Sequence, residues 1–405
     1  MALVRVTILA FVCNPQAGTE AGIGWRWAKT YSEMGHEVTI ISHVSQSQHF
    51  SEDMDLKGLE FVFLGSMGTV EPKAPTGIYQ MIRMKLMYSK WLDDVRSYLQ
   101  VGNFDFVQHV SWSTIRLRSP ARFYSGLAVF GPLGGGQKAS ISKIPRRDKF
   151  YEFARNISVF MSLVWQKRFS RVENQPLVLV TNNETEYFAK QVGYKDVLLE
   201  LADGIEIEWI RNSPRKISKN KINLLWGGRL VASKRPDLSL LVLHKLVEAG
   251  VNCHLNIAGD GNQLHRLQDS VRHLGLETRV HFLGRLSRDE MKILFDETDL
   301  VLFTSFRDSS SPIILEAASR GVPTIAIRNQ GVKSLIPFEV AIGPDGNLEI
   351  GECVDQMYEA VMGYSKDGTS YIASSASCLA FAREQEWRVK AERVLGYVEA
   401  RSEAI

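Results

Sequence analysis

The 405-residue sequence has few cysteines, and none of them stands close to another. Cys13, Cys253, Cys353 and Cys378 form no C-x-x-C pair, so the sequence indicates neither a disulfide framework nor a zinc site. We therefore expect free thiols, no bound metal and a reducing, cytoplasmic setting.

Long hydrophobic runs are also missing, since no apolar stretch approaches the roughly 20 residues that a membrane-spanning helix needs. The apolar start, residues 1–12, carries a single charge, Arg5, and leads into a glycine-rich turn. We interpret it as a first strand and not as a signal peptide. With 45% hydrophobic and 23% charged residues, the composition is that of a globular chain long enough for about two domains.

Acidic pairs of the kind that hold a metal are scarce. A lone D-x-D, Asp53 and Asp55, lies in a polar stretch and does not follow an apolar strand. Such a setting is typical of solvated surface, so we predict no metal there.

Net charge is small, +3, but it is unevenly distributed. Residues 77–171 contain sixteen lysines and arginines and only five acidic residues, which favours docking against something anionic. Residues 81–92 are basic and amphipathic, and residues 144–150 add charge. Our hypothesis is peripheral docking on an anionic membrane surface, and the alternative is a helix with one core face and one solvated basic face. We expect no nucleic-acid partner.

Predicted strands and helices alternate along the chain, as in parallel sheets with helical crossovers. The first half should contain strands at 4–12, 37–41, 59–64, 104–110, 127–130 and 177–181, and helices at 25–34 and 78–100. The second half should contain strands at 222–226, 253–258, 280–283, 300–303 and 323–327, and helices at 236–249, 263–273, after a capping box at 287–290, and at about 380–400. The polar stretch 212–221 is the predicted linker.

The most informative segment is 306–323, F-R-D-S-S-S-P-I-I-L-E-A-A-S-R-G-V-P. A polar loop ends at Pro312, a favourable first helical residue, so Asp308 and Glu316 bracket a helix N-terminus. The free N–H groups and dipole of such a terminus suit a phosphate, and the two carboxylates can accept hydrogen bonds from sugar hydroxyls. The segment therefore predicts a site for a nucleoside diphosphate sugar.

A second segment, 228–234, places Arg229 and Lys234 in the loop after a predicted strand. Two cations there can neutralise a diphosphate, and negative charge grows on that group as it leaves. We predict that both residues contact the diphosphate and act as electrostatic catalysts.

These segments together resemble the family-four retaining glycosyltransferases of GT-B fold. Asp308 and Glu316, with seven residues between them, resemble the family's acidic-x7-acidic motif, and 228–234 resembles its Gly-Arg-Leu-x-x-x-Lys clamp. Residues 257–261 and 281–284 fall where the family has a Gly-x-Gly loop and a base-contacting strand. The resemblance runs from about residue 5 to the end and is most specific in the second half. Ser309 and Ser311 stand where the family usually has glycine.

The resemblance implies an α/β protein with two Rossmann-like parallel-sheet domains facing across a cleft. An acceptor domain at 1–205, with a C-terminal helix at 385–405 packed back on it, would face a nucleotide-sugar domain at 206–384. The implied reaction is retaining, metal-independent transfer of a hexose-type sugar from a UDP- or GDP-sugar, without a cofactor. The implied acceptor is a hydroxyl of a cell-envelope polysaccharide or glycolipid precursor.

The implied site comprises catalytic and donor-binding residues. Glu316 would accept hydrogen bonds from the ribose and Asp308 would hold the donor sugar. His109 would orient the acceptor or accept its proton, although a hydrogen-bonded strand-end histidine is the alternative. The remaining donor-binding residues would be Gly18, Gly22, Gly228, Gly259, Leu283, Ser309, Ser310 and Ser311. Glu20 is the one candidate for a covalent nucleophile in the N-terminal loops, so a same-face substitution is favoured.

Other readings remain open at this point. The spacing of Gly18, Gly22 and Gly24 also fits a nicotinamide-dependent oxidoreductase, but Ser42 and His43 stand where an acidic ribose ligand is expected. No tyrosine is followed by lysine at the fourth position, as the short-chain enzymes require. A non-catalytic sugar-nucleotide-binding scaffold, a sugar-nucleotide epimerase and a transferase acting on a small secondary metabolite are further alternatives.

Overall fold

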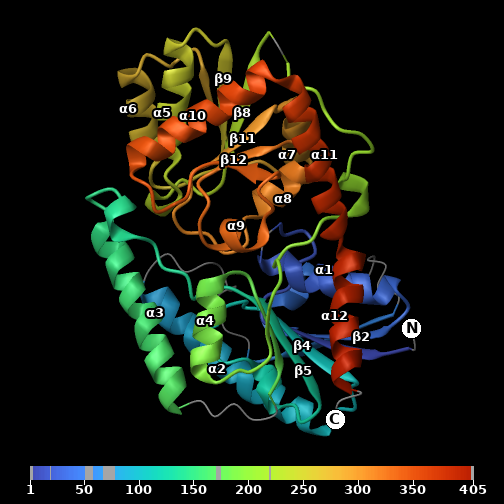
Figure 1. The fold of residues 1–405 in the computed structure, drawn as a ribbon. Coiled ribbons are helices and arrows are strands. Elements are labelled where there is room, and N and C mark those ends of the chain that lie inside the picture. The colour runs from blue at the N-terminus through green and yellow to red at the C-terminus, as the bar shows by residue number, and fades with distance from the viewer. Residues whose placement is uncertain are drawn as a thin grey trace.

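The computed structural model describes residues 3–18, 20–50, 58–66, 78–169, 175–218 and 220–402 (Figure 1). Two parallel sheets form the frame, with strand orders β3-β2-β1-β4-β5-β6-β7 and β10-β9-β8-β11-β12-β13. Figure 1 shows the first sheet below and the second above, each covered by helices. The predicted fold class, two parallel-sheet α/β units, is confirmed. The D-x-D pair lies outside the described residues.

The strands of the first sheet come from the first half of the chain, and those of the second sheet from the second half. The first seven are β1 (Arg5–Ala10), β2 (Glu37–His43), β3 (Leu59–Leu64), β4 (Phe106–Ser111), β5 (Leu127–Leu133), β6 (Leu177–Val180) and β7 (Val197–Leu199). The other six are β8 (Ile222–Gly227), β9 (Cys253–Ala258), β10 (Val280–Gly284), β11 (Leu300–Phe303), β12 (Thr324–Ala326) and β13 (Ala341–Ile342).

Helices connect the strands. Four belong to the first half: α1 (Glu20–Glu33), α2 (Ile78–Val101), α3 (Lys149–Phe169) and α4 (Asn183–Val192). The others are α5 (Pro236–Glu248), α6 (Leu264–His273), α7 (Arg288–Glu297), α8 (Pro312–Ser319), α9 (Gln330–Leu335), α10 (Ile350–Lys366), α11 (Gly368–Glu384) and α12 (Trp387–Ser402). The capping box predicted for α7 is present, with the Ser287 side chain accepting from the Glu290 N–H and the Glu290 side chain accepting from the Ser287 N–H.

The central strands are inaccessible on both faces, as expected where helices cover both sides of a parallel sheet. β4 and β11 are buried along their whole lengths. Burial of both faces leaves the carboxyl ends of the strands, and the loops that follow them, as the places where polar side chains can gather.

The chain crosses between the two sheets twice. Ile205, beyond β7, pairs with Glu386 in an isolated parallel bridge between α11 and α12. The tail predicted as a single helix is therefore two helices, broken at Gln385 and Glu386. In Figure 1 α11 lies beside the upper sheet and α12 runs down beside α1, where Trp387 meets Trp27 edge-on at 5.5 Å.

The described part of the predicted linker, 212–218 and 220–221, includes residues held firmly against the second unit. The Arg215 N–H donates to Ser375 Oγ at 2.8 Å, and the Arg215 guanidinium donates to the Phe295 carbonyl at 2.6 Å. A polar sequence here reflects hydrogen bonding to α7 and α11.

Candidate functional site

Two loops that are distant in sequence meet at the carboxyl edge of the second sheet, because β8 and β11 are neighbouring strands. The Phe306 N–H donates to the Ser233 carbonyl at 2.9 Å. Thr304 Oγ1 donates to the Lys234 carbonyl, also at 2.9 Å. The basic loop and the acidic loop predicted from sequence are thus fastened together by hydrogen bonds.

Lys234 and Asp308 form an ion pair in which both side chains are largely buried, with 17% and 11% exposed. Asp308 Oδ1 also accepts the backbone N–H of Ser309 at 2.7 Å and that of Ser311 at 3.3 Å. Asp308 therefore orders the loop before α8 and lies against the cation predicted to hold the diphosphate. A donor sugar at this carboxylate would share it with Lys234.

Three neighbouring loops make a single surface beside this pair. Gly228 and Arg229 are exposed at the end of β8, and Leu283 is 37% exposed in β10. Gly259 has φ near 140°, and a Cβ there would lie 1.8 Å from the Gly228 carbonyl oxygen. Only glycine permits this approach. The predicted donor residues of β8, β9 and β10 thus lie along one sheet edge.

Glu316 lies in the second turn of α8, half-buried. Burial raises the pKa of Glu316 to about 7; Arg288 and Arg26 lower it, while Asp203 and Glu206 raise it. The carboxyl group is thus set among charged side chains from both halves of the chain. Ribose hydroxyls that donate to Glu316 would favour its ionised form.

This surrounding cluster was not found by sequence reasoning. Glu206 Oε1 accepts from Arg26 Nε at 3.1 Å and from Arg288 Nη1 at 2.5 Å. Arg26 comes from α1 and Arg288 from α7, so Glu206 links the two units at the crossing. No spacing rule connects residues from three distant segments. The alternation of acidic and apolar residues at 203–208 is the one available signal.

Two serines of the acidic loop, Ser309 and Ser310, contact the first unit. Ser309 Oγ lies 2.9 Å from Thr181 Oγ1, and Ser310 Oγ donates to Asp203 at 3.2 Å. A Cβ on Gly134 would lie 2.1 Å from Ser309 Oγ, so the glycine-rich loop after β5 admits this serine only because it lacks a side chain. Ser311 adopts a left-handed backbone, φ 51°, which costs a non-glycine residue about 1–2 kcal/mol.

The first glycine-rich loop packs against α1. A Cβ on Gly22 would lie 2.1 Å from the Ala17 carbonyl oxygen, whereas Gly18 has open space around it. Arg26 donates to the Ala17 carbonyl at 3.2 Å and thereby fixes the loop. Glu20, in the first turn of α1, accepts from the Ser113 N–H at 2.8 Å and from Ser113 Oγ at 3.1 Å. Burial raises the pKa of Glu20.

His109 is fully buried in β4, with 1% of its surface exposed. Its Nε2 lies 3.1 Å from the Ser111 carbonyl, which makes Nε2 the protonated nitrogen. Burial lowers the pKa of His109 to about 4, so the ring is neutral near pH 7. Nδ1 is buried and has no hydrogen-bond partner among the described residues. Its role toward an acceptor stays a prediction.

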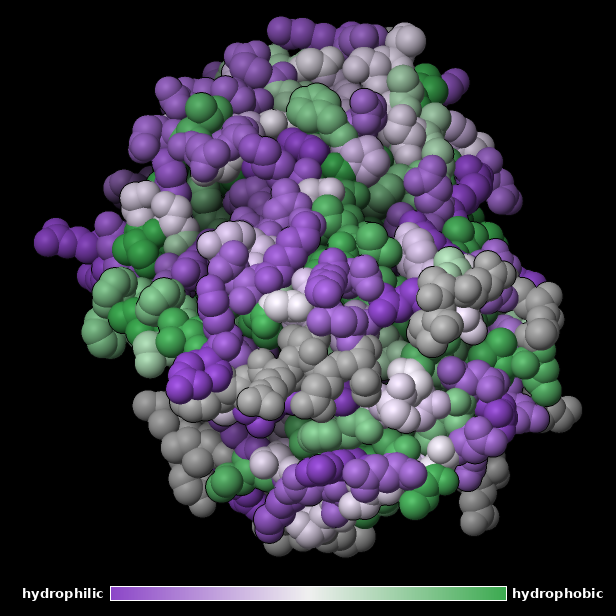
Figure 2. Space-filling view, turned by 60° about the horizontal axis from the view of Figure 1, so that its bottom comes forward, coloured by the Kyte–Doolittle hydropathy of each residue, from purple (hydrophilic) through white to green (hydrophobic). Residues whose placement is uncertain are grey.

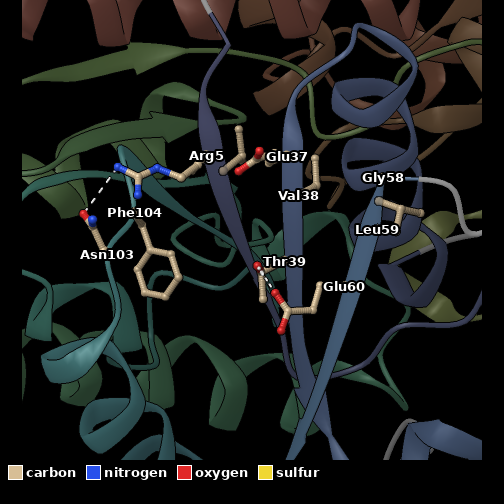
Figure 3. Close-up of a pocket in the computed structure, with 10 residues that line it drawn as sticks. Arg5, Glu37, Val38, Thr39, Gly58, Leu59, Glu60, Asn103 and Phe104 are labelled. Atoms are coloured by element: carbon tan, nitrogen blue, oxygen red, sulfur yellow. Dashed lines mark hydrogen bonds between the residues drawn. The ribbon is translucent and has the colours of Figure 1, made fainter.

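A separate cavity of about 430 Å³ lies at the amino ends of β1, β2 and β3 (Figure 3). Its polar side chains are already paired: Arg5 contacts Asn103 at 3.4 Å, and Thr39 Oγ1 donates to Glu60 at 3.1 Å. Because ligands of open parallel sheets bind beyond the carboxyl ends, this cavity is unrelated to the site above. In the part of the chain that the structure describes, no group of three or more His, Cys, Asp and Glu is arranged to hold a metal.

A model of a known protein family matches a region in the second half of the chain, which carries most of these residues. Residues 208–362 match the model of the family described as glycosyl transferases group 1. These residues belong to that family. The group 1 region contains Arg229, Lys234, Asp308 and Glu316, the four residues on which the sequence prediction rests most heavily.

Relatives and solved structures extend this result. The phosphatidylinositol N-acetylglucosaminyltransferase GPI3 subunit of Saccharomyces cerevisiae is 25% identical over 131 residues, which are 32% of this chain and 29% of that protein. The chain thus matches less than a third of that relative's length. Sucrose-phosphate synthase of Thermosynechococcus elongatus has a TM-score of 0.67 at 12% identity, covering 99% of this chain and 100% of its own. Anabaena HepE with UDP and glucose has a TM-score of 0.61 at 16% identity, covering 98% and 100%. Because both identities are low, this structural likeness establishes the fold alone, which is the GT-B fold.

The raised pKa of Glu316 predicts a pH effect on stability. Because the ordinary value is 4.5 and the folded value about 7, the protonated form is favoured in the folded protein. Relative to a Glu316→Gln variant, the wild type should lose stability as pH rises between these two values. Urea denaturation at pH 5, 6, 7 and 8 measures the difference. The exposed Glu297, changed to Gln, is the control. A difference between wild type and Glu316→Gln that stays constant from pH 5 to 8 would contradict the assignment.

Proposed function

We propose that the protein is a retaining, metal-independent glycosyltransferase that moves a hexose-type sugar from a UDP- or GDP-sugar to an acceptor hydroxyl. The observation that carries the proposal is the meeting of Lys234, Asp308 and the N-terminus of α8 at the carboxyl edge of a group 1 glycosyl transferase sheet. The structure of HepE with UDP and glucose supports a nucleotide-sugar donor for this fold.

In this proposal the diphosphate lies between the α8 N-terminus and the Arg229–Lys234 loop. The helix N–H groups and the two cations stabilise the charge that develops on the leaving phosphate. Glu316 accepts from the ribose, and Asp308 accepts from the donor sugar. Glu20 is already hydrogen-bonded twice to Ser113, which supports same-face substitution over a covalent intermediate at Glu20. The leaving phosphate then takes the acceptor proton.

The decisive experiment is a thermal-shift panel with UDP, GDP, ADP, TDP and NAD. A ligand at 100 times its Kd adds about 2.7 kcal/mol and should raise the melting midpoint by several degrees. We expect one nucleoside diphosphate to raise it, and Glu316→Ala to abolish the shift. Glu297→Ala, an exposed carboxylate on α7, is the matched control.

This panel, followed by an assay of sugar transfer and sugar conversion, separates the alternatives. A shift with NAD alone would replace the transferase by an oxidoreductase. A nucleotide shift without sugar transfer to any acceptor would favour a non-catalytic scaffold, and acceptor-independent change of the sugar would favour an epimerase.

The acceptor is proposed to be a cell-envelope polysaccharide or glycolipid precursor, met at an anionic membrane surface. The prediction placed this surface on residues 81–92 and 144–150. From residue 83 onward α2 buries Met84, Tyr88 and Trp91, whereas Leu86 is 61% exposed. The exposed apolar helix is α3. Its outward residues, each at least 46% exposed, are Phe150, Tyr151, Phe153, Ile157, Phe160, Met161, Val164 and Trp165.

Charge accompanies this apolar face. Arg146 and Arg147 are exposed just before α3, and Lys167 and Arg168 are exposed near its end. Figure 2 shows hydrophobic surface at its left margin, the side on which α3 lies in Figure 1. An apolar helix face with basic ends suits the interface of an anionic bilayer. Within the described residues, no helix has the length and hydropathy needed to span a membrane.

Liposome flotation tests this surface. We expect binding to vesicles with anionic lipid, weak binding to neutral vesicles, and a clear loss of binding in a Phe150→Ser/Phe160→Ser variant. Both phenylalanines are more than half exposed, so the variant should fold normally. The exposed Phe338→Ser, in the second unit, is the control. Equal binding to neutral vesicles would contradict the proposal.

A further inference from the structure

Three arginines, Arg116, Arg155 and Arg307, lie near one another where α3, the loop after β4 and the acidic loop meet, and Arg307 is paired with the buried Glu152. Arg307 Nη2 donates to Glu152 Oε1 at 3.0 Å and to Ser233 Oγ at 3.2 Å. Arg155, one turn after Glu152 on α3, donates to the Gln137 carbonyl at 2.9 Å. Arg116 lies beside the glycine-rich loop, since a Cβ on Gly135 would be 3.6 Å from Arg116 Nε.

This group contains three arginines and one glutamate, so its net charge is positive. Among the described residues, the one carboxylate that bonds to any of the three guanidinium groups is Glu152, and it bonds to Arg307 alone. Burial lowers the pKa of both Arg155 and Arg116; the charge of Arg307 lowers both further, and that of Arg116 also lowers the pKa of Arg155. The like charges are thus close enough to repel one another. Such a cluster destabilises the folded chain unless an anion offsets it.

Several buried polar atoms of this group also lack a hydrogen-bond partner among the described residues. Arg116 Nε, Arg307 Nε and Glu152 Oε2 are buried and have no partner among the described residues. All three arginines remain half-buried and so are partly open to solvent. A planar guanidinium fork suits the oxygens of a phosphate, which accepts several such bonds at once.

We propose that Arg116, Arg155 and Arg307 form a binding subsite for a phosphate group of the acceptor. The inference rests on the proposed function and extends it to the acceptor's chemistry. Arg116 and Arg155 belong to the first unit, opposite the Arg229 loop that would hold the donor. Arg307 Nη2 donates to the hydroxyl of Ser233, which precedes Lys234 in the sequence. A phosphate bound here would therefore place its acceptor beside the transferred sugar.

The position of the subsite relative to α3 defines how a lipid-linked acceptor would approach it. Glu152 and Arg155 lie on the inward side of the helix whose outward side is the exposed apolar face. A lipid-linked acceptor at that face would reach the arginines around the side of α3. Because the arginines come from both units, the bound phosphate would also hold the units together.

A calorimetric titration with inorganic phosphate, run with and without a saturating nucleoside diphosphate, tests the subsite. Inorganic phosphate can also occupy the empty donor site, so the deciding measurement is the one with the nucleoside diphosphate bound, and there we expect wild type still to bind phosphate. Arg155→Gln should weaken phosphate binding about tenfold or more, with nucleotide affinity unchanged. Glu152→Gln should strengthen phosphate binding, because it keeps the shape and removes the competing charge. Arg272→Gln, on the exposed face of α6, is the control.

The outcomes separate this inference from the proposed function. Absence of phosphate binding in wild type, or weaker binding in Glu152→Gln, would overturn the subsite. Loss of all phosphate binding when the nucleoside diphosphate is bound would overturn the acceptor role of the arginines. If no nucleotide binds but phosphate follows the expected pattern, the anion site stands and the transferase proposal fails.

Discussion

Replacing Lys234 by alanine should lower kcat about 100-fold or more, because the lysine would no longer stabilise the charge that grows on the leaving diphosphate. The side chain is buried against Asp308, and its carbonyl is hydrogen-bonded to Thr304, so its position is fixed before any ligand arrives. Arg229→Ala should lose a comparable factor. Steady-state kinetics with the nucleotide sugar identified by the thermal-shift panel measures both losses.

Asp308 provides a sharper version of this experiment. Because Asp308 is also proposed to hold the donor sugar, Asp308→Asn alone sets the reference. If Lys234 acts only by neutralising Asp308, a Lys234→Ala/Asp308→Asn double variant should recover the turnover of Asp308→Asn. If Lys234 contacts the diphosphate, the double variant should remain as slow as Lys234→Ala. We expect no recovery. Wild-type turnover in both Lys234→Ala and Arg229→Ala would remove the catalytic assignment altogether.

The second half of the fold was predictable from β8 to β12, because its local signals agree with one another there, whereas α9, β13 and α10 were not predicted. Strands predicted at 253–258 and 300–303 are found with those bounds, since short apolar runs there are enclosed by clear breakers. Pro236 and Pro312 begin α5 and α8 as expected of residues favoured at the first helical position. Because β8 and β11 are adjacent, the two motif loops could be expected to meet.

The first half was harder to predict, and neither α3 nor α4 was among its predicted helices. α3 was not predicted, because its many exposed aromatic residues, such as Phe150 and Phe153, do not give the apolar stripe of a core-facing helix. Contacts across the two units were equally hidden. The Arg26–Glu206–Arg288 link and the Ser309–Thr181 contact join residues that no local spacing relates.

Replacing Lys390 by alanine should have the largest effect on stability. Lys390 Nζ lies 2.5 Å from Glu200 Oε1 and donates to the Leu201 carbonyl at 2.8 Å, and the two charged side chains are 0% and 3% exposed. Removing one member of a buried pair leaves the other charge uncompensated and typically costs about 3–5 kcal/mol. Urea denaturation should show this loss.

Two controls locate its cause. Lys245→Ala breaks a pair with Asp355 that is largely exposed, and should cost about 0–1 kcal/mol. A Lys390→Met/Glu200→Leu variant removes both buried charges together and should recover much of the lost stability. If Lys390→Ala proves as mild as Lys245→Ala, the pair carries little of the stability of the crossing.

The place of this pair explains why it matters beyond stability. Glu200 directly follows β7, where the chain leaves the first sheet, and Lys390 lies on α12, which returns from the second unit. Arg393 approaches Glu200 at 3.4 Å but is 33% exposed, so it cannot fully replace the lysine. The pair therefore fastens both crossing segments to the first unit. Lys390→Ala should accordingly loosen the link between the units as well as lower the free energy of unfolding, and proteolysis near residues 385–386 should report it.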